Sequence, residues 1–195
     1  WNAFALRLGG AYSWHDIDTQ RAVVVNDVFT DSVKADYDAA TAQVFGEAGY
    51  RVGNAATYFE PFVGIAHVNI ATDDFTEEGG DAALTARSST HDTTFTTAGV
   101  RAQTAVSFGP TELTLRGELG WRHAFGDVTP VSQLSFAGHA PFAIAGAPLA
   151  RDALIIGAGF DLAMTGNAKL EVAYDGQVGD GVQQHGVTAR LGWRF

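Results

Sequence analysis

The chain has 195 residues, a formal charge of −10 and no cysteine. The negative charge argues against a nucleic-acid partner, and without cysteine the chain can build neither a disulfide framework nor a thiolate metal site. Although 46% of the residues are hydrophobic, no apolar run approaches the roughly 20 residues of a membrane-spanning helix. The sequence does not start with a signal peptide, and Trp1 opens directly into a strand-like pattern, so we expect the chain to be a piece of a longer protein.

Eight segments alternate between apolar and polar residues and are predicted to be strands. In chain order they span about residues 4–15, 38–51, 57–70, 93–106, 111–125, 151–162, 168–177 and 185–195. The fifth is the clearest, because Leu113, Leu115 and Leu119 share one face while Glu112 and Arg116 share the other. Pro61 weakens the third prediction, since proline normally restricts a strand to the edge of a sheet.

The connections between these segments alternate in length. Short turns are predicted at residues 52–56, 107–110 and 165–167, and long connections at about 16–34, 71–92 and 126–150. The third long connection contains two strand-like pieces, 131–136 and 141–144, which we interpret as a hairpin that extends its neighbours. This alternation places all the short turns at one end of an antiparallel sheet.

Charge is confined to one side of the predicted strands. Eight of the ten arginines lie on the polar parity, and mid-strand positions of the apolar parity carry no Asp, Glu, Lys or Arg. We expect a polar network facing the interior, formed by Arg7, Gln43, Glu47, Glu60, Arg101, Arg116, Glu118 and Arg122. These side chains could line a pore, or they could form fixed salt bridges that satisfy the interior, which we favour for most pairs.

Alternating segments of about ten residues, with short turns at one end and long loops at the other, are typical of an outer-membrane β-barrel. A charge on the lipid face costs about 2–4 kcal/mol at the membrane midplane, which explains the one-sided charge. A soluble β-sandwich or lipocalin-like barrel would also alternate, but its polar face should be rich in lysine and threonine, and this chain has only two lysines, Lys34 and Lys169. We therefore predict an all-β, antiparallel transmembrane barrel of about eight strands in the bacterial outer membrane, in contact with lipid and lipopolysaccharide.

The sequence favours no catalytic or metal site. The six histidines lack metal-ligand spacing, and no serine lies in a nucleophile elbow. An outer-membrane hydrolase built on paired carboxylates is the least favoured alternative, so we expect neither an enzyme nor a cofactor. A divalent ion that bridges to lipopolysaccharide could bind the acids of the second long connection, although a solvated loop is the favoured interpretation; these acids are Asp73, Asp74, Glu77, Glu78 and Asp81.

The string Gly-Trp-Arg-His-Ala-Phe-Gly-Asp at residues 120–127 resembles the C-terminal translocator barrel of classical autotransporters, which belong to type V secretion. Further matching stretches lie at residues 5–9, 43–50, 59–62, 94–97 and 190–195. The resemblance implies that residues 1–195 are the C-terminal part of a barrel domain that secretes an N-terminal passenger. It also implies that the barrel assembly machinery reads the closing strand, which maps onto Val187, Ala189, Leu191, Trp193 and Phe195.

Barrels of this family have twelve strands and an inner helix, whereas eight strands are counted here. The resemblance therefore implies that the first strands, the helix and any passenger precede Trp1, and that no catalytic residue is carried over. The closing strand would end in the periplasm, so the short turns would be periplasmic and the long loops extracellular. The alternative is a small, closed, eight-stranded structural or adhesive barrel, in which the first and last strands pair.

Overall fold

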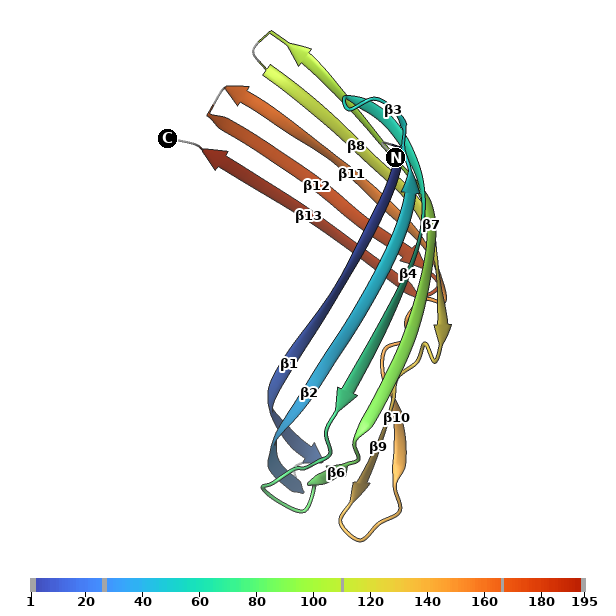
Figure 1. Ribbon diagram of the computed structural model, residues 1–195. Coiled ribbons are helices and arrows are strands. Elements are labelled where there is room, and N and C mark those ends of the chain that lie inside the picture. The colour runs from blue at the N-terminus through green and yellow to red at the C-terminus, as the bar shows by residue number, and fades with distance from the viewer. Residues whose placement is uncertain (1–2, 26–27, 110, 166, 194–195) are drawn as a thin grey trace.

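The computed structural model describes residues 3–25, 28–109, 111–165 and 167–193. Eight strands form one antiparallel sheet in the order β1-β2-β4-β7-β8-β11-β12-β13 (Figure 1). Their bounds are β1 (Phe4–Val25), β2 (Phe29–Tyr50), β4 (Thr57–Thr72), β7 (Ser89–Phe108), β8 (Thr111–Gly126), β11 (Asp152–Thr165), β12 (Ala168–Gly179) and β13 (Val182–Trp193). These strands confirm the eight predicted segments. No helix in the described ranges is long and apolar enough to cross a membrane.

The sheet is strongly curled but open. Among the described residues β1 and β13 are its two edges and do not pair with each other. Figure 1 shows both chain ends at the end of the sheet that carries the short turns, which we call the turn end, opposite the loop end. A closed eight-stranded barrel is therefore not what this chain forms, because the ladder that would close it is absent from the described strands.

The first long connection was predicted as a polar loop, and that prediction is wrong. β1 and β2 have 22 residues each, and their register runs without a shift from Phe4 opposite Tyr50 to Val25 opposite Phe29. The hairpin continues because the connection is rich in β-branched residues, which favour strands. A polar run, residues 19–21, and an apolar run, residues 22–25, replace the alternation there, so the periodicity did not indicate a strand.

Pro61 lies within an interior strand, since β4 has β2 on one side and β7 on the other. The ladder with β2 ends at Phe62, and a two-residue strand, β3 (Val52–Gly53), resumes the pairing at Phe59. Pro61 pairs only with Val100 of β7. A proline cannot donate a ladder hydrogen bond, and the gap between β2 and β3 falls where that bond would be missing.

A second sheet, which we call the loop sheet, lies at the loop end. It has the order β10-β9-β6-β5 and comprises β5 (Phe75–Thr76), β6 (Leu84–Ala86), β9 (Val131–Phe136) and β10 (Phe142–Ala145). The predicted hairpin in the third long connection is thus confirmed as β9 and β10. It does not extend β8 and β11, however, but pairs with β6 from the preceding loop.

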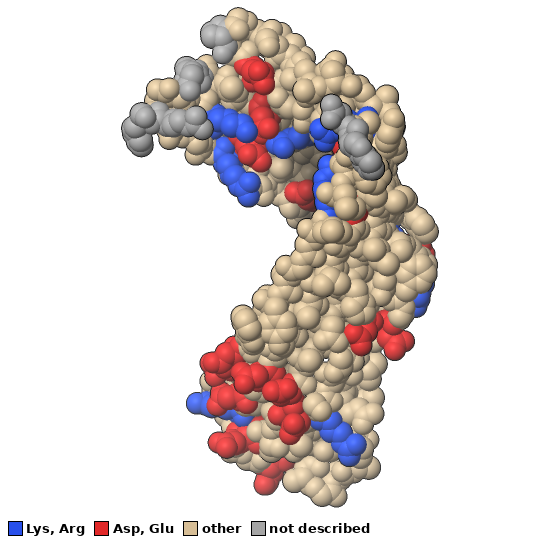
Figure 2. All heavy atoms as spheres, in the orientation of Figure 1, with Lys and Arg blue, Asp and Glu red and all other residues tan. Residues whose placement is uncertain are grey.

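The curled sheet has an apolar convex face and a charged concave face. Large apolar side chains on the convex face are exposed, with Leu8 at 72% and Trp14 at 80%. Figure 2 shows charged residues gathered in the hollow at the turn end and again at the loop end, with a largely uncharged region between them. So large an apolar surface requires a non-aqueous neighbour.

We expect Gly99→Ala to destabilise the fold, because a Cβ atom there would lie 2.6 Å from the Leu119 carbonyl oxygen and 2.8 Å from the Phe62 ring. Overpacking of this kind costs about 1–3 kcal/mol. The control is Gly117→Ala on the adjacent strand, where a Cβ meets nothing within 4 Å. The midpoint of guanidinium unfolding of the full-length protein in detergent should fall for the first variant only; equal midpoints would contradict the packing argument.

Candidate functional site on the concave face

Glu47 on β2 lies at the centre of the charged concave face. Arg7 is its direct cross-strand neighbour on β1, and Arg7 Nη1 donates to Glu47 Oε1 at 2.8 Å. From the other side, Arg101 Nη2 on β7 donates to Glu47 Oε2 at 2.7 Å. One carboxylate therefore joins two arginines from strands that lie on either side of β2.

Glu60 on β4 is the most enclosed charge of the described residues, with 0% of its surface exposed. Arg51 donates to its Oε2 atom from Nη2 at 2.8 Å and from Nε at 3.0 Å. Arg7 Nη2 lies 2.8 Å from Oε1, an ion-pair contact whose angles fall outside hydrogen-bond geometry. Arg101 Nη1 lies 3.8 Å from the same Oε1 atom. Three guanidinium groups thus neutralise a carboxylate that water does not reach, as a buried charge requires.

Arg101 joins these pairs to the next strand. Its Nε donates to Glu118 Oε2 on β8 at 2.6 Å, and its guanidinium lies 3.8 Å from the centre of the Phe62 ring. Arginine stacks on an aromatic face while its planar fork bonds carboxylates. Arg7, Glu47, Arg51, Glu60, Arg101 and Glu118 form what we call the charged network, which spans β1, β2, β4, β7 and β8.

A second group of charges lies on β8, β11, β12 and β13. Arg116 donates to Asp161 at 2.7 Å and lies 3.7 Å from Glu171. Lys169 lies 3.6 Å from Asp161, and Arg190 lies 3.8 Å from Glu171. A cavity of about 260 Å³ separates this group from the charged network and is lined by residues of both.

The predicted network residues therefore divide into four sets. Five of them meet in the charged network, and Arg116 belongs to the second group. Arg122 is separate, because it donates to Thr97 at 3.4 Å and to Gln177 at 3.1 Å. Gln43 makes no side-chain hydrogen bond within the described residues.

Sequence reasoning did not single out Arg51 or Phe62 as site residues. Arg51 is a polar-parity arginine next to a turn, so its parity was a usable signal. Phe62 lies on the same face of its strand as Glu60. An aromatic residue on a polar face that also carries arginines indicates that an arginine could stack on its ring.

The proposed assembly residues lie on the convex face of the edge strand β13. Val187, Leu191 and Trp193 are exposed, and Ala189 shares their parity. Phe195 lies outside the described residues. The convex face of this strand is therefore free to contact lipid or another protein.

The loop end contains a further ion pair. Arg21 of β1 donates to both carboxylate oxygens of Glu77, and its Nη2 also donates to the Ala82 carbonyl oxygen at 2.9 Å. Burial alone would raise the pKa of Glu77, but hydrogen bonds from Arg21 and from the Leu84 amide hold that pKa below its ordinary value. The expectation of a solvated loop is therefore wrong for Glu77, whose side chain is largely buried.

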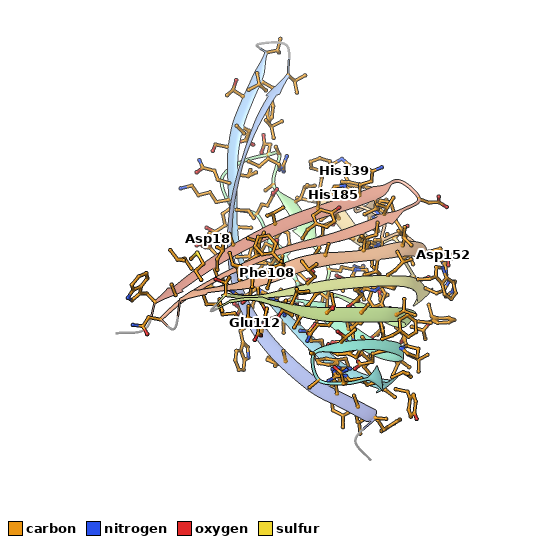
Figure 3. All side chains as sticks on the ribbon, turned by 90° about the horizontal axis from the view of Figure 1, so that it is seen from above. Asp18, Phe108, Glu112, His139, Asp152 and His185 are labelled. Atoms are coloured by element: carbon orange, nitrogen blue, oxygen red, sulfur yellow. The ribbon has the colours of Figure 1, made fainter. Side chains whose placement is uncertain are left out.

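The other acids of that loop, Asp73, Asp74, Glu78 and Asp81, are exposed. Within the ranges that the structure describes, no three His, Asp or Glu side chains are placed to hold a metal ion. On the adjacent hairpin, Asp18 (labelled in Figure 3) lies directly opposite Asp36, and their hydrogen bond raises the pKa of Asp18.

Comparisons with known proteins point in one direction. Residues 1–175 match the family described as the autotransporter beta-domain. Two extracellular serine proteases of Serratia marcescens are 39% and 37% identical over 194 residues, which is 99% of this chain but only 18% of each protease. The translocator domain of autotransporter NalP from Neisseria meningitidis superposes with a TM-score of 0.67 at 15% identity, over 96% of this chain and 60% of that domain.

We expect Glu60→Gln to destabilise the protein, because it leaves three guanidinium groups facing a neutral amide on the concave face. Loss of a buried charged partner of this kind costs about 1–3 kcal/mol. Glu112→Gln is the matched control, since this exposed glutamate of the same face has no ion-pair partner among the described residues. Guanidinium unfolding should separate the two variants, and equal stabilities would show that the pairing contributes little.

The Glu77 pair should make the loop sheet sensitive to acid. Because the folded-state pKa is lowered, the stabilisation is present above the ordinary glutamate pKa of about 4.3 and is lost as the pH falls through the folded-state value. Hydrogen exchange of residues 75–86, corrected for the intrinsic pH dependence, should show protection at pH 6 that decreases below about pH 4. Arg21→Gln should lower the protection at pH 6, and an unchanged profile in that variant would contradict the assignment.

Proposed function

This chain belongs to the autotransporter β-domain family, and from that premise we propose that its curled sheet is the wall along which the polypeptide preceding Trp1 leaves the cell. Domains of this family are outer-membrane β-barrels that translocate a passenger. The proposal rests on one observation: the same open sheet has an exposed apolar convex face and a charged concave face. Lipid would cover the first face, and the second would line the interior.

The open edges support a barrel completed by further strands. The chain spans only 18% of the length of the curated relatives and 60% of the NalP domain. We propose that strands preceding Trp1 fill the gap between β1 and β13, because unpaired backbone groups are too costly within a membrane. The turn end would then face the periplasm and the loop end the cell exterior.

The charged network supports an interior that guides a chain without binding it tightly. Each of its carboxylates already has an arginine partner within 2.8 Å. A polypeptide in transit would therefore contact a hydrated surface on which most carboxylates are already neutralised by arginines. The pairs also hold five neighbouring strands together on the concave side, which we propose is their main role.

We assign no catalytic role to these 195 residues. The two Serratia proteins are named serine proteases, but the match covers 18% of each, so we place any passenger activity in the segment before Trp1. The partners we propose are outer-membrane lipid and lipopolysaccharide on the convex face, the passenger on the concave face, and the barrel assembly machinery at the closing strand.

The test uses the full-length protein in a Gram-negative host. Its N-terminal region should be accessible to protease added to intact cells, and Phe195→Ala should reduce that display by removing the aromatic side chain of the proposed assembly signal. Arg194→Ala is the control at the adjacent position of opposite parity. An N-terminal region that stays inside the cell would contradict the translocator function. Normal display by Phe195→Ala would contradict only the assembly signal.

A further inference from the structure

The hairpin of β1 and β2 continues past the sheet that carries it. β2 pairs with β4 only from Ala39 onward, whereas its pairing with β1 continues to Val25 opposite Phe29. Figure 3 shows the tip of the hairpin projecting beyond the remaining strands. Since β1 is the terminal strand of the sheet, its residues 16–25 present a free backbone edge among the described residues, which we call the distal edge.

The last four residues of the distal edge have little of the protection that natural edge strands carry. Edges are normally guarded by charged side chains, proline, bulges or short length, and the charges of this edge, Asp16, Asp18 and Arg21, all precede residue 22. Residues 22–25 read Ala-Val-Val-Val, Val24 is 61% exposed, and the β1–β2 register has no bulge. The nearest charge, Arg21, is bound to Glu77 and the Ala82 carbonyl. An edge of this kind is suited to pairing with another strand.

The hairpin is also held firmly in place. Val33 and Ala35 of β2 are buried, as are Ala82 and Ala86 of the loop sheet region. Lys34 and Glu78 exchange two backbone hydrogen bonds, of 2.8 and 2.7 Å. The rings of Tyr37 and Phe75 stack 4.2 Å apart. β2 is therefore fixed against the loop sheet region beside the distal edge, which lowers the entropy cost of adding a strand.

The direction of the chain identifies the occupant. β1 begins at the turn end (Figure 1), so the segment that precedes it arrives at that end. A short turn there would place this segment antiparallel to β1 along its free edge, the commonest arrangement for consecutive strands. Two-fifths of the NalP domain lies outside the match, which leaves room for such a strand.

We propose that the strand preceding Trp1 pairs with β1 along its whole length, including the distal edge, and so forms a three-stranded ribbon that carries the loop sheet beyond the membrane. This rests on the proposed function, which requires a preceding strand against the proximal part of β1. It goes further in setting the length of that strand and in making it a structural support of the extracellular loops.

Hydrogen exchange of the full-length protein in detergent tests separately whether a preceding strand pairs with residues 4–15 of β1 and whether that strand continues along the distal edge. Amides of residues 16–25 should exchange as slowly as those of residues 39–49 on β2, which are paired on both sides. If residues 4–15 are protected while about half of the amides of residues 16–25 exchange at least 100-fold faster than those of residues 39–49, the preceding strand ends at the membrane and the inference is wrong. If residues 4–15 also exchange fast, no strand completes the barrel and the proposed function itself fails.

Removal of the surface-exposed passenger by trypsin on intact cells identifies the occupant. Protection of residues 16–25 that survives this treatment supports the barrel strand. Protection that disappears with the passenger would show that the passenger covers the edge, and would overturn our assignment.

Two adjacent proline variants give an independent test. Successive residues of an antiparallel strand direct their backbone groups to opposite sides, so Val23→Pro and Val24→Pro each remove a different ladder bond. If both edges of β1 are paired, both variants should make the hairpin several-fold more sensitive to protease than the unmodified protein. If the distal edge is free, one of the two substitutions should be tolerated, which would contradict the inference.

Discussion

Backbone pairing between consecutive antiparallel strands is the constraint on which the rest of this molecule depends. The ladders from β1 to β13 fix which residues stand opposite one another. Successive side chains of a strand point to opposite faces of the sheet, so they lie alternately on the convex and the concave face. Because the convex face is apolar and exposed, a slip of one residue in any ladder would place arginines and glutamates against lipid. The fold therefore tolerates variation in its loops far more readily than in its register.

The charged network follows from that register. Arg7 opposite Glu47 and Arg101 opposite both Glu60 and Glu118 are cross-strand neighbours, so their side chains need only short reaches to meet. Buried ion pairs are not in themselves a strong source of stability. They allow charge to be placed on a concave wall at low cost, and they give that wall a polar surface with few uncompensated charges.

The loop end adds structure that a simple barrel does not need. The long β1–β2 hairpin, the Arg21–Glu77 pair and the loop sheet form a second packed region, with its own buried residues Val33, Ala35 and Ala82. This region joins three connections that are distant in sequence.

The sequence by itself determined the number and faces of the strands, the positions of the short turns and the resemblance to a family, because all of these depend on local alternation and on a string such as residues 120–127. It could not tell whether Gln43 or Arg51 joins the network, since that depends on which strands are neighbours and at what register. It also mistook residues 16–34 for a loop, because a solvated strand and a polar connection have similar composition. Only the tertiary structure decided the open edge, the loop sheet and the burial of Glu77, since each arises from contacts between segments that are far apart in the chain.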